Sequence, residues 1–334
     1  MSARYLTLTI TPELAGLEVN TLLRRHLGLS GTLLRRVKWL EDGITLDGVR
    51  VNVRVRAAEG QTLAVRLTSP GQSPLQGEHP SGLSPCAPPP LLSQPDPLRR
   101  ASAGSPGVVP MEGPLDIVYE DQDLIVLNKA PGVLVHPGHG HFDDTLGNFL
   151  MFHYKMSGEE SGFHPVHRLD KGTSGLMVAA KHPHAQERLK NQLHTGDFRR
   201  VYLAVCDGIP PEPAGVIDAP IGPAEGSLTA RQVRPDGKPA RTQYKMVRTR
   251  GSRALVELEL ETGRTHQIRV HMACLGCPLT GDFLYGAEDK ALIGRPALHS
   301  ARLELTHPVT GERLAFSVPL PADMAALIPE ENII

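Results

Sequence analysis

One carboxylate in this chain is placed where it could do chemistry. Asp170 stands between two cations, Arg168 and Lys171, and is followed by turn-forming residues and then by an unbroken apolar run over residues 176–180. Such a run predicts a short buried strand, so the acid should lie in a turn beside a strand. Nearby positive charge favours an ionised carboxylate, which can attack an electrophilic carbon once it is positioned. An Asp that merely closes a turn fits the same pattern, and spacing alone does not separate the two interpretations.

The residues around Asp170 resemble a known enzyme signature. Residues 167–181 read HRLDKGTSGLMVAAK, which is similar to the signature of the RluA-type pseudouridine synthases, HRLD followed by TSGL. Every residue of both pieces is present. The resemblance implies that Asp170 is the catalytic nucleophile of an RNA pseudouridine synthase.

Four other segments extend the resemblance over most of residues 114–325. Residues 118–138 resemble the family's opening strand pair and KPxG turn, with the sequence VYEDQDLIVLNKAPGVLVHPG. Residues 201–208, VYLAVCDG, resemble the segment that holds the family's active-site Tyr. Residues 261–286 resemble its third motif, and residues 297–321 resemble its closing segment.

The resemblance also implies roles for individual residues. Tyr202 should lie in the active site, where its ring can stack on uracil and its phenol can accept a proton from C5, although an ordinary pKa of about 10 makes that transfer demanding. Arg269 should pair with the nucleophile. Arg168 should take part when a uridine is flipped out of folded RNA. Structural interpretations stay open: Tyr202 can pack at a strand end, and Arg168 can pair with a nearby acid.

Three further residues are candidates for contacts with the base or with RNA. Ile268 can form an apolar wall against the base, and Arg264 can touch a phosphate or a carboxylate. Lys129 resembles the lysine of the KPxG turn and could contact RNA, although Ala130 stands where Pro is usual. A lysine that lies along the turn without touching RNA explains the same pattern.

Residues 114–334 predict an α+β domain with a mixed, largely antiparallel sheet. Residues 116–130 indicate two strands around a turn, and residues 253–261 alternate between two faces. Residues 184–196 place leucines one turn apart and end at a glycine, as is typical of an amphipathic helix. Two more helices are expected over residues 263–276 and 322–328. The resemblance implies that this is the pseudouridine synthase fold, which the pattern alone does not specify.

Residues 1–68 predict a small basic module. They hold ten Lys and Arg residues against six Asp and Glu residues. Residues 29–52 indicate a helix, a turn and then a hairpin through Asp47-Gly48. The arrangement resembles a degenerate S4-type RNA-binding domain, and an accessory domain with a merely solvated basic helix is the alternative. The helix residues expected to contact RNA are Arg35, Arg36 and Lys38.

Residues 69–113 predict a linker between the two modules. They contain eleven of the 30 prolines in the chain, with many Ser and Gly residues and no periodic apolar pattern. Segments of this composition bury too little apolar surface to fold, so we expect disorder. The catalytic domain is then expected over residues 114–334.

Overall composition narrows the class of protein. The chain has 334 residues, of which 40% are hydrophobic and 21% charged, and this is enough for a large core or two domains. It has no apolar run of the roughly 18 residues that a membrane helix needs, and its N-terminus lacks the features of a signal peptide. Four scattered cysteines agree with a reducing compartment. We therefore expect a cytoplasmic protein with no membrane partner.

The sequence offers weak alternatives that involve a metal. Cys274 and Cys277 form a CxxC, but a structural zinc site normally needs a second ligand pair at similar spacing. Two His pairs were also considered as ligands: His164 with His167, and His139 with His141. Pro165 disfavours the helical geometry that would orient the first pair. We expect no metal.

The expected reaction needs no cofactor. Uridine isomerisation breaks the N1–C1′ bond and joins C5 to C1′ without redox change, and the chain lacks the GxxxxGK[ST] and GxGxxG nucleotide-binding patterns. The expected partner is RNA, with rRNA favoured over tRNA, and the chain is expected to be a monomer. Two other classes stay open: a non-catalytic RNA-binding or ribosome-assembly protein, and a metal- or thiol-dependent hydrolase.

Overall fold

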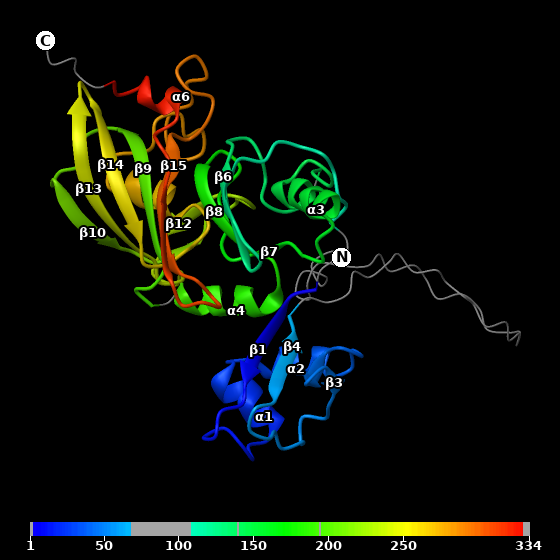
Figure 1. Cartoon of the computed structure of the whole chain (residues 1–334). Coiled ribbons are helices and arrows are strands. Elements are labelled where there is room, and N and C mark those ends of the chain that lie inside the picture. The colour runs from blue at the N-terminus through cyan, green and yellow to red at the C-terminus, as the bar shows by residue number, and fades with distance from the viewer. Residues whose placement is uncertain (1–2, 68–107, 139, 194, 330–334) are drawn as a thin grey trace, which may run out of the picture.

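The computed structural model describes residues 3–67, 108–138, 140–193 and 195–329 (Figure 1). Most of the predicted linker, residues 69–107, lies outside the described residues. Two β-sheets with separate hydrophobic cores organise the rest, a small one near the N-terminus and a large one that includes most of the later strands.

The N-terminal module is built on a four-stranded sheet in the order β1-β4-β2-β3. Its strands are β1 (Tyr5–Thr9), β2 (Ile44–Leu46), β3 (Val49–Arg50) and β4 (Thr62–Arg66). Its helices are α1 (Val19–Thr21), the π-helix η1 (Leu22–His26) and α2 (Gly31–Val37). Leucine-rich faces of these elements pack into a core of their own.

Two local features of this module agree with its sequence. Helix α2 begins after Ser30, whose side chain accepts a hydrogen bond from the backbone N–H of Leu33, as N-cap residues do. The hairpin between β2 and β3 turns at Asp47 and Gly48, which both have positive φ, of 51° and 80°. A two-residue turn with this backbone matches the twist of the flanking strands. The predicted helix and hairpin are therefore confirmed.

The large sheet has ten strands, eight of them in the order β10-β13-β14-β9-β15-β8-β6-β5, with β16 beside β15 and β7 beside β8. The strands are β5 (Ile117–Glu120), β6 (Leu124–Lys129), β7 (His164–Pro165), β8 (Ser174–Ala180), β9 (Arg199–Asp207), β10 (Ala214–Asp218), β13 (Arg241–Arg250), β14 (Arg253–Leu260), β15 (Leu298–Thr306) and β16 (Arg313–Ser317). A separate ribbon pairs β11 (Ile221–Pro223) with β12 (Arg231–Val233). The pairing of β8 with β15 is parallel and the other pairings of the large sheet are antiparallel, so the expected mixed α+β class is confirmed.

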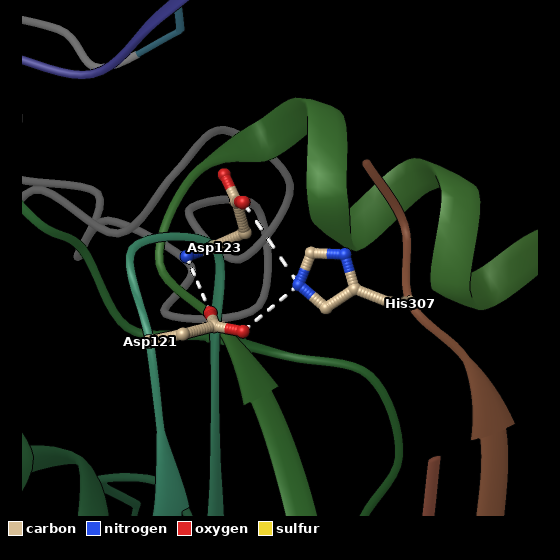
Figure 2. A group of neighbouring side chains, drawn as sticks. All are labelled: Asp121, Asp123 and His307. Atoms are coloured by element: carbon tan, nitrogen blue, oxygen red, sulfur yellow. Dashed lines mark hydrogen bonds and ion pairs between the residues drawn. The ribbon is translucent and has the colours of Figure 1, made fainter. Parts of the chain in front are cut away.

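Charged side chains attach the N-terminal module to the large sheet. Arg4 donates two hydrogen bonds to Asp123, at 2.9 and 3.0 Å, and Arg66 pairs with Glu160. Asp123 belongs to a cluster with Asp121 and His307 at the start of β6 (Figure 2). The two modules therefore meet through specific ion pairs.

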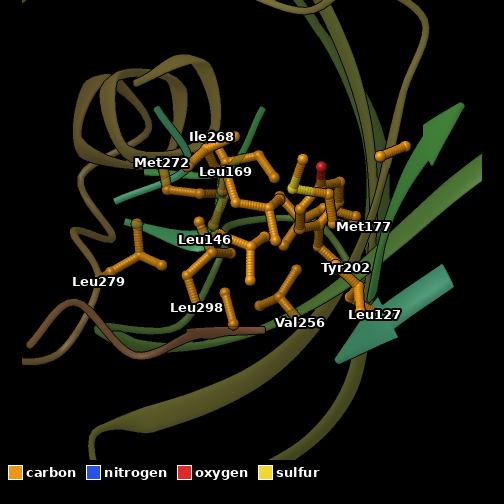
Figure 3. Packing of buried hydrophobic residues seen from close by; sticks show 14 of the residues in the cluster. Leu127, Leu146, Leu169, Met177, Tyr202, Val256, Ile268, Met272, Leu279 and Leu298 are labelled. Carbon is orange, nitrogen blue, oxygen red and sulfur yellow. The ribbon is translucent and has the colours of Figure 1, made fainter. Parts of the chain in front are cut away.

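The sheet is covered by hydrophobic cores on both faces. Every residue of β8 is buried, and successive side chains alternate between the two cores, with Met177 in one and Val178 in the other. One core gathers Leu169, Tyr202 and Ile268 beside Met177 (Figure 3). Residues that flank the predicted nucleophile are thereby fixed by packing.

Four helices accompany the sheet: α3 (Leu146–Ser157), α4 (Pro183–Gln192), α5 (Gln267–Cys274) and α6 (Ala322–Ala325). Helix α4 ends short of the predicted Gly196, because the Thr195 hydroxyl and N–H both bond to the carbonyl of Gln192. Helix α6 is a single turn. Helix α3 was not predicted, although Gly158, with φ of 70°, is a typical helix-ending residue.

The last residues of the predicted linker belong to the large domain. The backbone N–H of Met111 donates to the carbonyl of Asn148 at 3.2 Å, and the Asn148 amide donates to the carbonyl of Val109 at 2.8 Å. These bonds fix residues 109–111 against α3. Residues 109–111 therefore contact the large domain just before the predicted boundary at residue 114, which stays a prediction. Across the described ranges, no helix is long and apolar enough to cross a membrane.

Candidate active site

Asp170 lies in the turn that leads into β8. The backbone N–H of Thr173 donates to the Asp170 carbonyl at 3.1 Å, which closes the turn. Gly175 follows with φ of 106°, and a Cβ there would meet the carbonyl oxygen of Ser300 at 2.3 Å. Only glycine fits this close parallel approach of β8 to β15. The TSGL part of the motif therefore brings the Asp170 turn against β15.

The carboxylate of Asp170 has a cation and an imidazole nearby but no hydrogen bond from the described residues. Its Oδ2 lies 3.8 Å from Nη1 of Arg269 and 3.9 Å from Nε2 of His266. The side chain is 21% exposed. Its oxygens thus remain available to a substrate, with the guanidinium of Arg269 as the nearest cation.

Arg269 is held by a second acid. Its Nε and Nη2 both donate to Asp282, each at 2.7 Å, in the bidentate geometry that suits a guanidinium. Burial alone would lower the pKa of Arg269, but the bonds and charge of Asp282, together with Asp170, raise it. Arg269 is therefore a fixed cation that points its remaining nitrogen toward Asp170.

Tyr202 is a buried residue of β9 and lines the same cavity as Asp170. Burial raises the pKa of its phenol above the ordinary value of about 10. The phenol is therefore protonated at neutral pH. This favours contact with the base and makes the role of proton acceptor more demanding.

One cavity of about 360 Å³ joins most of the predicted site. Its walls come from the Asp170 turn, from β9, and from the end of β14 with the start of α5. Six predicted residues line it: Asp170, Tyr202, Arg269, Arg168, Ile268 and Arg264. Residues distant in sequence thus converge on one hollow, as a site for a flipped base requires.

Lys129 does not lie where an RNA contact would need it. It is 1% exposed, and its Nζ donates to the carbonyls of Ala130 and Val133 at 2.8 Å and of Lys171 at 3.3 Å. Burial lowers the pKa of this amine to about 7, although the charge of Asp170 opposes the shift. The expectation of an RNA contact is corrected: Lys129 ties strand β6 to the turn behind Asp170.

The basic residues predicted in the N-terminal module lie apart from this cavity. Arg35 and Arg36 are exposed in the last turn of α2, and Lys38 follows as its C-cap. None of the three lines the cavity. Their contact with RNA stays a prediction.

His266 is a member of the site that the sequence analysis did not single out. It has φ of 59°, a backbone conformation that a non-glycine residue rarely adopts and that clusters at functional sites. Its Nδ1 lies 2.8 Å from the hydroxyl of Tyr285, which also accepts the backbone N–H of Arg231 at 2.8 Å. Burial lowers the pKa of His266, with Asp170 opposing the shift, so a neutral imidazole faces the carboxylate at neutral pH.

The cysteines and histidines that the sequence offers as metal ligands do not form a cluster in the described ranges. Cys277 is buried while Cys274 is exposed, and Nε2 of the His167 ring accepts the backbone N–H of Val178 at 3.3 Å. Burial lowers the pKa of His167 to about 3. His139 lies outside the described residues. The group with suitable spacing for a metal is instead Asp121, Asp123 and His307.

Comparisons with known proteins agree with this site. Residues 123–274 match the family described as RNA pseudouridylate synthase. The uncharacterized RNA pseudouridine synthase YjbO of Bacillus subtilis (strain 168) is 38% identical over 307 residues, which cover 92% of this chain and 97% of that protein. The ribosomal large subunit pseudouridine synthase D of Vibrio cholerae is 45% identical over 227 residues, 64% of this chain and 70% of that protein.

A solved structure shares the fold. The human RNA pseudouridylate synthase domain containing 1 superposes with a TM-score of 0.52 and 27% identity, over 62% of this chain and 83% of that one. The superposition agrees with the mixed sheet, and the curated relative matched along 97% of its length carries the assignment. This chain therefore belongs to the RNA pseudouridine synthases, enzymes that isomerise uridine to pseudouridine in RNA.

Proposed function

We propose that this enzyme modifies specific uridines of large-subunit ribosomal RNA, with Asp170 as the nucleophile. The choice of RNA follows the name of the 45%-identical relative from Vibrio cholerae. One observation carries the role of Asp170: its carboxylate opens into the cavity beside Arg269 and no described residue donates a hydrogen bond to it. A carboxylate without such bonds keeps its lone pairs for an electrophilic carbon.

The reaction needs a charged attacking group and a pocket that keeps hold of the free base. The N1–C1′ bond breaks and a C5–C1′ bond forms, while C5 loses a proton and N1 gains one. Asp170 acts on the ribose or the base, and the guanidinium of Arg269, 3.8 Å away, supplies the opposing charge. Tyr202 and Ile268 supply aromatic and aliphatic walls that retain uracil while it turns. Arg264 lies at the rim, where it can meet a phosphate.

The N-terminal module is proposed to add affinity for RNA. Arg35, Arg36 and Lys38 lie exposed on or beside one short helix, and each phosphate contact would make binding more sensitive to salt. We also propose that this module has an S4-like fold, that the domain limits predicted from the sequence hold, and that the enzyme is a monomer. tRNA is the alternative substrate.

The test begins with a map of pseudouridines in rRNA and tRNA from cells with and without this protein. The purified protein is then given unmodified transcripts of the mapped RNA. We expect conversion at the mapped uridine without added cofactor, and a loss of at least about 1,000-fold in Asp170→Asn. Asp144→Asn, in a nearby exposed loop outside the cavity, is the matched control and should act as wild type.

Two outcomes would overturn the proposal. Conversion by Asp170→Asn at the wild-type rate would remove Asp170 as nucleophile. Changes confined to tRNA would replace the proposed substrate. A cellular role that Asp170→Asn leaves intact would instead favour a non-catalytic RNA-binding protein.

A further inference from the structure

A second cavity lies beside the first, and the two meet at Asp170. It has a volume of about 910 Å³. Six residues line both cavities: Arg168, Leu169, Asp170, Thr173, His266 and Arg269. Asp170 and its neighbours therefore form a wall that the two cavities share, and the first cavity alone has room for one uracil.

The second cavity has the lining that a nucleobase needs. Leu134, Val135 and Leu284 give it apolar surface, and Phe283 adds an aromatic ring that is 60% exposed. The guanidinium carbon of Arg269 lies 5.7 Å from the centre of that ring. An exposed aromatic ring of this kind is the platform on which single-stranded bases stack.

Two cations of the second cavity form no ion pair with a described residue: Lys171, which lines this cavity alone, and Arg168, which lies on the shared wall. In the second cavity Arg295 is neutralised by two bonds to Asp323, and Arg269 by its bonds to Asp282. Arg168 is exposed, lines both cavities and forms no ion pair with a described residue. A guanidinium so placed complements an anionic group that passes from one cavity to the other.

We propose that the second cavity receives the nucleotide next to the target uridine in the same RNA strand. Its base stacks on Phe283, and Arg168 contacts the phosphate that joins the two nucleotides. An occupant that is covalently linked to the uridine explains why the cavities share a wall and why an unpaired cation, Arg168, lies on it. This inference rests on the proposed function, because it requires a uridine beside Asp170.

The proposal makes a statement about specificity. Every base has an aromatic face, so stacking tolerates exchange of one base for another and fails when the base is missing. We therefore expect the neighbouring nucleotide to strengthen binding whatever its identity.

The test uses the full-length protein and a short RNA fragment that contains the mapped uridine, with an abasic residue on either side of it. In wild type, an abasic residue on one side should raise the KM by roughly 5- to 150-fold, the range expected for loss of one stacked base. Phe283→Ala should raise the KM for intact RNA by a similar factor and then respond little to the abasic residue. Phe283→Leu, which keeps apolar volume, should behave like Phe283→Ala.

Phe142→Ala is the matched control, because Phe142 is a 69% exposed aromatic residue that lines neither cavity. It should retain both the wild-type KM and the wild-type sensitivity to the abasic residue. Independent, multiplying effects of Phe283→Ala and the abasic residue would overturn the inference, as would a wild type indifferent to both neighbours. A wild type that makes no pseudouridine in any RNA would instead overturn the proposed function.

Discussion

Two groups of acids and bases in this enzyme contain the same residue types and differ in how fully they are bonded. At the active site, Oδ2 of Asp170 lies 3.8 Å from Nη1 of Arg269 and 3.9 Å from Nε2 of His266. At the start of β6, Asp123 accepts bonds from Arg4 and from His182, all between 2.9 and 3.0 Å. The lone pairs of the Asp170 carboxylate therefore remain free, whereas those of Asp123 accept hydrogen bonds.

The imidazoles that contact Asp121 and Asp123 at the start of β6 are also fully bonded, and Figure 2 shows one of them, His307, beside both acids. Nδ1 of His307 accepts the backbone N–H groups of Val309 and Thr310, so its other nitrogen carries the proton that binds Asp121. His182 is fixed in the same way by the N–H of Ala185. No ring nitrogen in this group has a free lone pair for a metal. Saturated bonding marks a structural cluster, and unsatisfied bonding marks a reactive one.

The largest effect should come from the saturated acid inside the active site. Asp282→Asn removes the charge that holds Arg269, and breaking a buried ion pair typically costs about 3–5 kcal/mol. We expect that loss in the free energy of unfolding measured in urea, with a fall in the single-turnover rate because Arg269 is no longer fixed. Asp144→Asn is again the control. Unchanged stability would show that the Asp282 pair is not a support of the site.

A smaller effect should follow at the other group. Asp123→Asn exchanges a carboxylate for an amide. The amide nitrogen is a donor and would face another donor, from Arg4 or His182. We expect the free energy of unfolding to fall by about 2–3 kcal/mol. The rate at saturating RNA, measured where the variant is folded, should equal that of wild type. A large fall in that rate would contradict the separation of the two groups.

The smallest effect should be seen in acid. Burial alone would raise the pKa of Asp123, but the bonds from His182 and Arg4 lower it to about 2, whereas an unfolded Asp titrates at about 3.9. A lowered pKa stabilises the fold above the unfolded value, and this contribution disappears as the pH falls through the folded value. Between about pH 4 and pH 2, wild type should lose about 1–2 kcal/mol more than Asp123→Asn. Parallel pH profiles of the two proteins would contradict this.

Sequence alone predicted the parts of the site that lie within continuous motifs. The HRLD and TSGL segments predicted the turn and the strand. The resemblance also placed Tyr202 and Arg269, from other segments, beside Asp170. In the structure Tyr202 and Arg269 line the same cavity as Asp170, and Arg269 also lies 3.8 Å from its carboxylate. The class of sheet followed from alternation and from glycine and turn patterns.

The rest depended on packing and backbone geometry that spacing does not encode. The motif predicts an RNA contact for Lys129 because it does not reveal that three carbonyls enclose its amine. The helix expected from residue 263 begins only at Gln267, because His266 adopts a left-handed backbone. Asp282 and Phe283 lie within residues 261–286, which resemble the third motif, but their roles depend on contacts with Arg269.

The narrow parallel contact between β8 and β15 has a consequence for the timing of activity. It consists of two residue pairs, Ser174 with His299 and Gly175 with Ser300, and in the sheet β15 is the strand that separates β8 from β9. During translation β8 and β9 emerge long before β15. Until Leu298–Thr306 has been synthesised, nothing in the sheet keeps the strand after Asp170 beside the strand of Tyr202. A nascent chain should therefore be unable to isomerise uridine until most of its sequence has left the ribosome.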